Sequence, residues 1–226
     1  MTELILALDT PRAADALRLL DQLPVLQWVK VGSILMTREG PDFVRQLTAR
    51  GLKVFLDLKW HDIPNTVAGA VTAARELGVS MATVHALGGS AMLEAAAVAA
   101  GGDLAVIGVT VLTSHDSPNY GRAVGRTDVD LGHEVERQGL VAIAAGLQGI
   151  VCSPQEVSLL RGRLGPEPLI VVPGIRRRSD SASDQARVAT AKDAVMNGAT
   201  HLVVGRPILH AADPALAFEE FLEEAR

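Results

Sequence analysis

The amino-acid sequence predicts an α/β fold in the form of a single (β/α)8 TIM barrel, on the basis of three observations. Short β-type runs alternate with longer amphipathic stretches, and this alternation can be followed through eight strand-helix units. The predicted strands are apolar on both faces, as parallel strands covered by helices must be. Polar side chains recur where these strands end, which is where barrel enzymes place their chemistry. An open, doubly wound parallel sheet is the alternative that the same pattern leaves open.

The eight units can be assigned in order along the chain. The expected strands are Leu4–Leu8, Trp28–Val31, Lys53–Lys59, Met81–His85, Leu104–Thr110, Gly149–Cys152, Leu169–Val172 and His201–Val204. The expected helices are Pro11–Leu20, Gly40–Arg50, Pro64–Leu77, Ser90–Ala99, Asp128–Ala145, Pro154–Arg163, Asp184–Asn197 and Asp213–Glu224. No linker interrupts the alternation, so we expect residues 1–226 to form one barrel domain with its site at the C-terminal ends of the strands.

Composition narrows the class of ligand and the cellular location. The chain has 226 residues, of which 48% are hydrophobic, and this is enough for one sizeable core. Its formal net charge of −5 and the absence of a basic run argue against a nucleic-acid partner and favour a small phosphorylated metabolite. Without a cationic leader or an apolar run long enough to span a bilayer, the protein is expected to be cytoplasmic, with no membrane partner.

Cys152 is the only cysteine, so the chain cannot form an intramolecular disulfide. It lies in an apolar run, and no partner base is apparent in the sequence. We therefore interpret it as a small core residue and not as a nucleophile.

The strand Lys53–Lys59 leads directly into a charged turn. Side chains alternate along a strand, so Phe55, Asp57 and Lys59 share one face, and Asp62 follows shortly after them. Pro64 suits the first turn of a helix, where Asp62 or Asn65 is a candidate cap. A simple ion pair plus a cap is the structural alternative. Two carboxylates crowded around one lysine favour a functional site, because like charges gathered in this way oppose folding.

Further polar side chains follow the other predicted strands. The set that converges on one end of the barrel is Asp9, Lys30, Asp57 with Lys59, His85, Thr113 and Arg206. Asp9 and Lys30 would equally form a plain interstrand ion pair. His85 has no metal-ligand pattern beside it, so we interpret it as a hydrogen-bonded wall residue.

The last predicted strand leads into a candidate phosphate site. Gly205 lets backbone N–H groups approach an anion, Arg206 adds a fork of donors, and Pro207 is suited to open a short helix. The alternative is a turn that carries a surface arginine. Two loops, Leu112–Thr127 and Pro173–Ser183, exceed the usual connection length and are lid candidates above the barrel.

The segment Asp57–Thr66 reads Asp-x-Lys-x-x-Asp followed by Ile-Pro-Asn-Thr, and it closely resembles the signature of the orotidine 5'-phosphate decarboxylase family. The resemblance extends over almost the whole chain. Its other segments are Leu8-Asp9, Lys30-Val31-Gly32, Val109–Ser114, Pro173–Arg176 and Val204–Pro207. It implies conversion of orotidine 5'-monophosphate to uridine 5'-monophosphate and carbon dioxide, in pyrimidine synthesis, without a metal ion or cofactor.

The resemblance also implies a role for each matching residue. The catalytic set is Lys59, Asp57, Asp62 and Lys30, in which Asp57 faces the C6 carboxylate of the substrate and Lys59 stabilises and protonates the C6 carbanion. The substrate-binding set is Asp9 and Lys30 with Asp57 at the ribose and the reacting centre, Thr113 and Pro173 at the base, and Arg176, Gln185, Gly205 and Arg206 at the phosphate. Asp62 and Thr66 belong by resemblance to the neighbouring subunit's pocket, which implies a homodimer.

Two other functions are compatible with parts of the sequence. Asp57, Asp62 and a barrel phosphate site would also suit a magnesium-dependent decarboxylase or aldolase of sugar phosphates. A phosphometabolite-binding protein without catalytic activity is the other candidate, although it gives no purpose to Lys59 between two carboxylates.

Overall fold

The strands form a closed barrel in a computed structural model that describes residues 2–177 and 187–226. All neighbouring strands are parallel, and the barrel closes because β1 pairs with β8 as well as with β2. The strands are β1 Glu3–Ala7, β2 Trp28–Gly32, β3 Lys53–Trp60, β4 Met81–His85, β5 Ala105–Val109, β6 Gly149–Val151, β7 Leu169–Val172 and β8 His201–Val204. The predicted TIM barrel is therefore confirmed, and the open doubly wound sheet is wrong.

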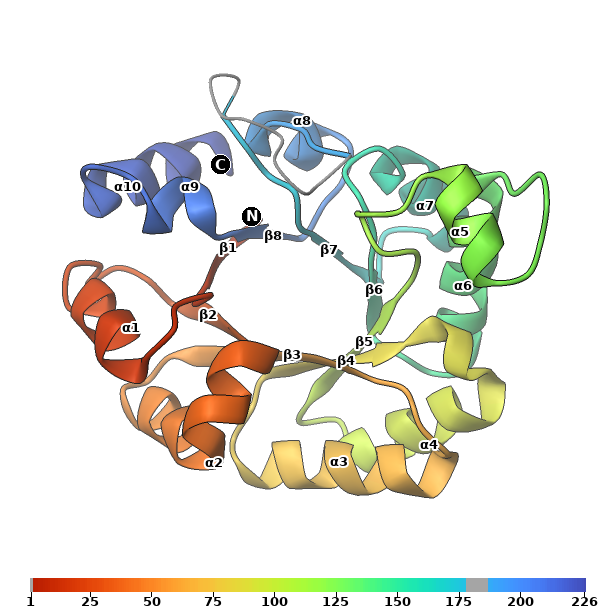
Figure 1. Cartoon of the computed structure of the whole chain (residues 1–226), viewed down its shortest axis with the longest axis horizontal. Coiled ribbons are helices and arrows are strands. Elements are labelled where there is room, and N and C mark those ends of the chain that lie inside the picture. Colours follow the sequence, from red (N-terminus) through yellow and green to blue (C-terminus); the bar gives the residue numbers. More distant parts are fainter. Residues whose placement is uncertain (1, 178–186) are drawn as a thin grey trace.

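Helices surround the barrel on its outside (Figure 1). They are α1 Ala13–Leu20, α2 Ser33–Ala49, α3 Pro64–Glu76, the 3-10 turn η1 Ala86–Gly88, α4 Ser90–Ala100, α5 Ser117–Ala123, α6 Leu131–Ala144, α7 Val157–Leu164, α8 Ala191–Met196, α9 Arg206–Leu209 and α10 Pro214–Glu224. The short α9 after β8 is the helix that Pro207 predicted. No helix in the described ranges is long and apolar enough to cross a membrane.

Several helix boundaries differ from the prediction for local reasons. Helix α2 begins at Ser33, and Gly40, with φ 67°, is a kink inside it and not its start. Helix α8 begins only at Ala191 because the Thr190 side chain caps it by accepting the Asp193 N–H. Residues 187–190 are not helical, so the predicted start at Asp184 was wrong for the described part of that range.

Two features near the barrel mouth were also predicted incorrectly. Helix α5 occupies part of the segment predicted as a long loop, and Asp116 caps it by accepting the Asn119 N–H. At the start of α3, Pro64 takes the first position as predicted, but no side chain caps the helix. The Asp62 carboxylate instead accepts a 2.7 Å hydrogen bond from the adjacent Ile63 N–H.

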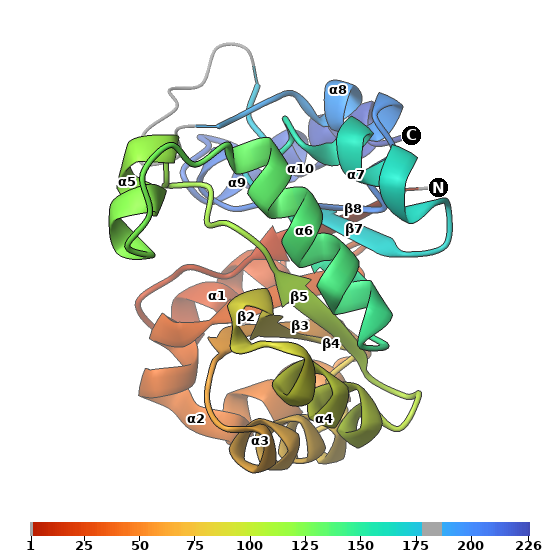
Figure 2. The same ribbon diagram turned by 90° about the vertical axis from the view of Figure 1, so that its right-hand side faces the viewer.

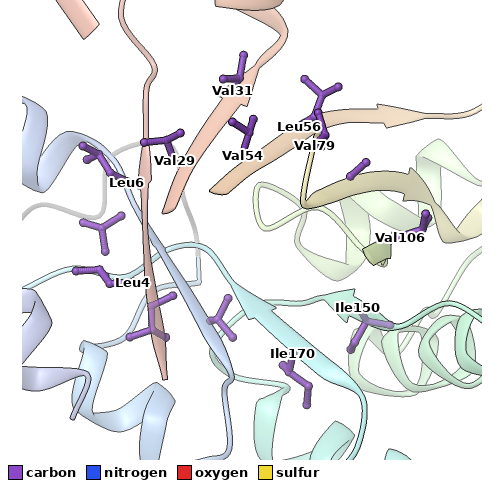
Figure 3. Packing of buried hydrophobic residues seen from close by; sticks show 14 of the residues in the cluster. Leu4, Leu6, Val29, Val31, Val54, Leu56, Val79, Val106, Ile150 and Ile170 are labelled. Carbon is purple, nitrogen blue, oxygen red and sulfur yellow. The ribbon is translucent and has the colours of Figure 1, made fainter. Parts of the chain in front are cut away.

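The apolar core has two layers, because successive side chains of a strand point to opposite faces. Leu4 and Leu6 of β1 belong to the layer between sheet and helices, and Figure 3 shows them with other members of that layer. Residues of the opposite face fill the barrel interior: Ile5, Ala7, Trp28, Phe55, Met81, Ile107, Val171 and Val203. Phe55 therefore lies inside the barrel, and Asp57 and Lys59 emerge above it at the C-terminal end.

A side view shows α5 at the end of the barrel opposite the N-terminus (Figure 2). The C-terminal ends of the parallel strands meet at this end. The fold thus brings the strand-end residues of distant segments to one surface, as the sequence predicted.

Candidate active site

A cavity of about 210 Å³ opens at the C-terminal end of the barrel. Most of the predicted site residues line it: Asp9, Lys30, Asp57, Lys59, Thr113, Pro173, Arg176, Gly205 and Arg206. They come from β2 and β3 and from the segments after β1, β5, β7 and β8. The fold therefore gathers charged residues from many parts of the sequence around one concave site.

Four of these side chains form a chain of alternating charge. The Lys59 ammonium lies 2.8 and 2.9 Å from the two carboxylate oxygens of Asp57. The Lys30 ammonium lies 3.6 Å from Asp57 and 3.1 Å from Asp9. The interstrand pair of Asp9 and Lys30, considered as an alternative to a site, exists and is also part of the cavity wall.

Asp57 is held in its ionised form. Burial alone would raise the pKa of this carboxyl group, but Lys30, Lys59 and the Thr83 hydroxyl outweigh burial and place the pKa below its ordinary value. Only 13% of the Asp57 side chain is exposed, and 11% of Lys30. A fixed negative charge therefore stands beside two ammonium groups at the base of the cavity.

The residues predicted to hold a phosphate lie after β7 and β8. Arg176 is buried, its backbone N–H donates to the Ala189 carbonyl at 3.0 Å, and its guanidinium donates to the Ile175 carbonyl at 2.8 Å. Gly205 packs closely enough on β1 that a Cβ there would lie 3.4 Å from that of Ala7. Arg176, Gly205 and Arg206 all line the cavity, so two arginines belong to its wall. Gln185 lies outside the described residues.

Asp62 and Thr66 are the described residues of the predicted catalytic and substrate-binding sets that the structure does not bring into the cavity, and the strand-end residue His85 does not line it either. Asp62 and Thr66 are both exposed, and neither lines the cavity of its own chain. Between them, Ile63 leaves 67% of its surface exposed, which is unusual for a large apolar side chain beside a charged site. Residues 62–66 are therefore accessible for contact with the surface of another molecule.

Cys152 agrees with its interpretation as a core residue. It is 1% exposed, and burial raises the pKa of its thiol far above the ordinary value, so it stays protonated.

The interpretation of His85 as a hydrogen-bonded wall residue was wrong. Its Nδ1 is buried without a hydrogen-bond partner among the described residues, and the ring lies 5.6 Å from that of His61. Burial lowers the pKa of His85, with smaller effects from His61 and Lys59.

Sequence reasoning missed a buried ion pair behind the cavity. Arg187 pairs with Glu156 and donates to the carbonyls of Val111 and Leu112, at 3.4 and 3.2 Å. It therefore ties the segment after β7 to the strand end that leads to Thr113. The only local signal was Ser153 three residues before Glu156, which is the spacing of a capping box.

Sequence reasoning also missed Thr83, whose hydroxyl contacts both Asp57 and the Lys59 backbone. Its available signal was a polar residue at the centre of the apolar run Met81–His85, on the same face as Met81 and His85.

A closed barrel whose C-terminal cavity is lined by an Asp-Lys array and by arginines after β7 and β8 defines the class of (β/α)8 enzymes that act on small phosphorylated substrates. The family model described as "Orotidine 5'-phosphate decarboxylase / HUMPS family" matches residues 2–221. The chain belongs to this family.

Individual relatives agree with the family match. The chain is 51% identical over 218 residues to a protein from Halorhodospira halophila named orotidine 5'-phosphate decarboxylase, with 95% of this chain and 92% of the relative covered. A protein of the same name from Alkalilimnicola ehrlichii is 48% identical over 227 residues, with 99% and 96% covered. The crystal structure of orotidine 5'-phosphate decarboxylase from Lactobacillus acidophilus superposes with a TM-score of 0.88 at 36% identity, covering 100% of both chains.

Proposed function

We propose that this chain is a carboxy-lyase that converts orotidine 5'-monophosphate to uridine 5'-monophosphate and carbon dioxide in de novo pyrimidine biosynthesis. The observation that carries the proposal is the Lys59 ammonium held 2.8 Å from Asp57 inside the cavity of a barrel that belongs to this family. Relatives that cover nearly the whole chain are named for this activity. They do not favour the magnesium-dependent sugar-phosphate enzyme.

The proposed chemistry needs only groups that line the cavity. The bond between C6 and the carboxylate breaks, carbon dioxide leaves, and the electron pair stays on C6. The Lys59 ammonium stabilises this developing charge and then donates a proton to C6. Asp57 holds Lys59 in place and presents a negative charge toward the substrate carboxylate, which destabilises the bound substrate relative to the transition state.

The remaining site residues are proposed to bind the parts of the substrate that do not react. Asp9 and Lys30 suit the ribose hydroxyls, because a carboxylate accepts and an ammonium donates hydrogen bonds. Thr113 and Pro173 suit the base, through a polar contact and an apolar wall. Arg176, Gln185, Gly205 and Arg206 are proposed for the phosphate. The presence of both arginines in the wall of the cavity that holds the Asp-Lys array supports this orientation.

We further propose a homodimer in which Asp62 and Thr66 enter the neighbouring subunit's site, where Asp62 adds a second carboxylate near Lys59. Their exposure, together with that of Ile63, supports this placement. Mixing Asp62→Ala chains with Lys59→Ala chains tests it, because one site of each mixed dimer would hold both native residues. Regained turnover is expected, and confirmed heterodimers without turnover would contradict a shared site.

Two further proposals concern the extent of the domain and the cellular location of the protein. We propose that residues 1–226 act as one domain and that the protein works in the cytoplasm. One continuous barrel over the described ranges supports the first point, and a small, freely diffusing nucleotide substrate supports the second. Fractionation of cells that express the tagged chain tests the location.

The proposed reaction is tested by mixing purified protein with orotidine 5'-monophosphate in excess chelator and following the ultraviolet absorbance. The product is then compared with authentic uridine 5'-monophosphate by chromatography. Conversion is expected with the chelator present. A substrate that stays intact in folded protein would refute the proposal and direct the search to sugar phosphates, first with and then without added Mg²⁺.

A further inference from the structure

Thr83 is a polar residue buried completely in the barrel, at the centre of β4. A hydroxyl group removed from water must find hydrogen-bond partners, or it destabilises the fold. Thr83 does not satisfy its hydroxyl on its own strand. Its partners are the two residues of β3 that carry the proposed reaction, Asp57 and Lys59.

The Thr83 hydroxyl forms a bridge between these two residues. Its oxygen accepts the Lys59 backbone N–H at 2.8 Å, and its proton is donated to the Asp57 carboxylate at 3.0 Å. One hydroxyl can do both, since it has one proton to donate and two lone pairs to accept with. Asp57 in turn contacts the Lys59 ammonium at 2.8 Å, which closes a ring of interactions around the lysine.

The backbone of β3 explains why this bridge is needed. The pairing register of β3 with β4 shifts between Leu56 and Trp60, as in a β-bulge. Within that irregular stretch Lys59 has φ 53°, in the left-handed region that residues other than glycine rarely adopt. Such a conformation persists only where surrounding contacts hold it, and the hydroxyl of Thr83 supplies the contact to the Lys59 N–H.

We propose that Thr83 is a positioning residue of this site, whose hydroxyl fixes the left-handed backbone of Lys59 and the orientation of the Asp57 carboxylate so that the ammonium is aimed at the reacting carbon. The reaction that Thr83 serves is the proposed decarboxylation of orotidine 5'-monophosphate, so this inference rests on the proposed function. Thr83 does not line the cavity and acts only through its two neighbours.

The test compares Thr83→Val, which keeps the shape and removes the hydroxyl, with Thr83→Ser, which keeps the hydroxyl. For Thr83→Val we expect kcat to fall about 10- to 100-fold while KM changes less than about threefold, because alignment is lost and phosphate binding is not. Thr83→Ser should retain kcat within about threefold. The acid limb of the pH profile of kcat should move to higher pH in the valine variant, since the ionised Asp57 loses a donor.

A matched control is Thr200→Val, at the N-terminal end of β8. The Thr200 hydroxyl accepts the Ile170 N–H at 2.9 Å and also lies within hydrogen-bond distance of the Ile170 carbonyl, at 3.1 Å, and of His201 Nδ1, at 2.9 Å. This variant should lose stability without losing kcat or moving the pH profile. Equal losses of kcat in the serine and valine variants of Thr83 would overturn the proposal, as would a valine variant with unchanged kcat and pH profile.

A second readout separates this proposal from the assignment of the reaction. Carboxyl carbon NMR of the native protein and of Thr83→Val gives the pKa of Asp57 without any turnover. A higher pKa in the variant supports the bridge even if orotidine 5'-monophosphate proves not to be the substrate, and an unchanged pKa overturns it. If the valine variant does not fold, Thr83→Ala removes the same hydroxyl and is measured in the same way.

Discussion

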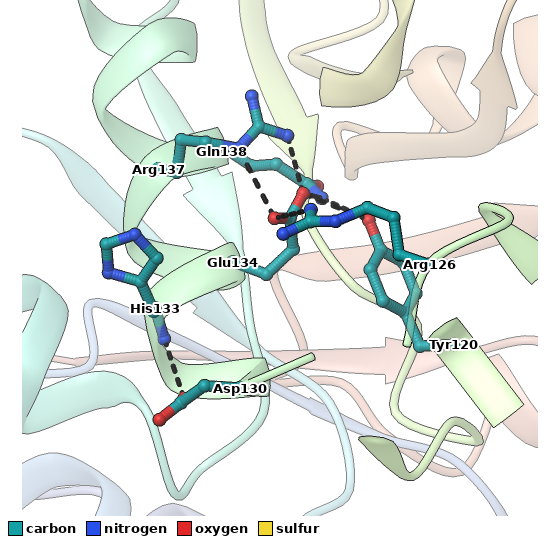
Figure 4. A network of polar contacts seen from close by, with 7 residues as sticks. All are labelled: Tyr120, Arg126, Asp130, His133, Glu134, Arg137 and Gln138. Carbon is teal, nitrogen blue, oxygen red and sulfur yellow. Dashed lines mark hydrogen bonds and ion pairs between the residues drawn. The ribbon is translucent and has the colours of Figure 1, made fainter. Parts of the chain in front are cut away.

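Asp57 and Glu134 are both carboxylates withdrawn from solvent and flanked by two cations, yet their surroundings are different. Glu134, in the first turn of α6, accepts hydrogen bonds from Arg126, Arg137, Gln138 and the Tyr120 hydroxyl (Figure 4). Hydrogen bonds from Arg137 outweigh burial and, with the other donors, lower the pKa of Glu134 to about 2. Its oxygens are occupied by donors of the protein itself.

Asp57 is flanked by lysines, whereas Glu134 is flanked by arginines, and the two carboxylates also lie in different places in the fold. Arginine stays protonated in proteins, whereas a lysine ammonium can donate its proton. Asp57 and Lys59 line the cavity at the C-terminal end of the barrel, and Glu134 does not line that cavity. Two flanking cations therefore do not identify a catalytic carboxylate. A carboxylate is identified as catalytic by a proton donor beside it and by space for a ligand.

Next to the removal of Lys59 itself, the largest expected effect is that of Asp57→Asn on turnover. Without the carboxylate, Lys30 and Lys59 repel one another and the proton donor loses its fixed position. We expect kcat for orotidine 5'-monophosphate to fall about 10³-fold, with the thermal unfolding midpoint measured to show that the variant is folded. A loss below tenfold in folded protein would place the chemistry elsewhere.

Arg206→Ala should act mainly on substrate capture. A charged hydrogen bond to phosphate contributes roughly 1.5–3 kcal/mol, so KM is expected to rise about 10- to 100-fold while kcat falls less. Steady-state kinetics with the 5'-phosphate substrate measure both constants. A fall in kcat as large as that of Asp57→Asn, with KM unchanged, would contradict a phosphate role.

Glu134→Gln should affect stability and leave chemistry nearly intact. The side chains of its partners Arg126 and Arg137 are about half exposed, at 54% and 51%. Because solvent weakens these ion pairs, the variant is expected to lose only about 1–3 kcal/mol of unfolding free energy. Urea denaturation measures this loss, and kcat/KM should stay within about threefold. Glu136→Gln on the same helix is the matched control, since it removes only the outer pair with Arg163 and should cost less than about 0.5 kcal/mol. Equal destabilisation by the two variants would mean that the Glu134 network has no special role.

The smallest expected effect is the pH dependence of the stability that Glu134 contributes. The folded-state pKa of Glu134 is about 2, below its ordinary value of 4.5, so its stabilising effect is complete above pH 4.5 and is lost as the pH falls toward 2. The difference in unfolding free energy between the native protein and Glu134→Gln should therefore shrink as the pH falls from 4.5 toward 2. Urea curves at several pH values measure it, and a constant difference would show that the ionised carboxylate is not the stabilising group.

The sequence was informative where local pattern decides structure. Apolar runs predicted the strands and their closure into a barrel, and Asp57 and Lys59 followed from strand alternation and their place at a strand end. The bridge of Thr83 and the pair of Glu156 with Arg187 depend on contacts between residues far apart in sequence. Those contacts exist only once the barrel has formed, so the local signals, a polar residue inside an apolar strand and a capping-box spacing, do not reveal the partners. The kink at Gly40 was missed because glycine suits a helix start and a break equally well.

The most direct test of the central claim is a single-turnover experiment with Lys59→Ala. The variant, shown to be folded and to bind uridine 5'-monophosphate, is mixed in excess with orotidine 5'-monophosphate, and the product is measured over a period that allows many turnovers of the native enzyme. If Lys59 stabilises and protonates the C6 carbanion, the substrate remains intact. Conversion within tenfold of the native rate would contradict that role and remove the basis for distinguishing this site from the Glu134 network.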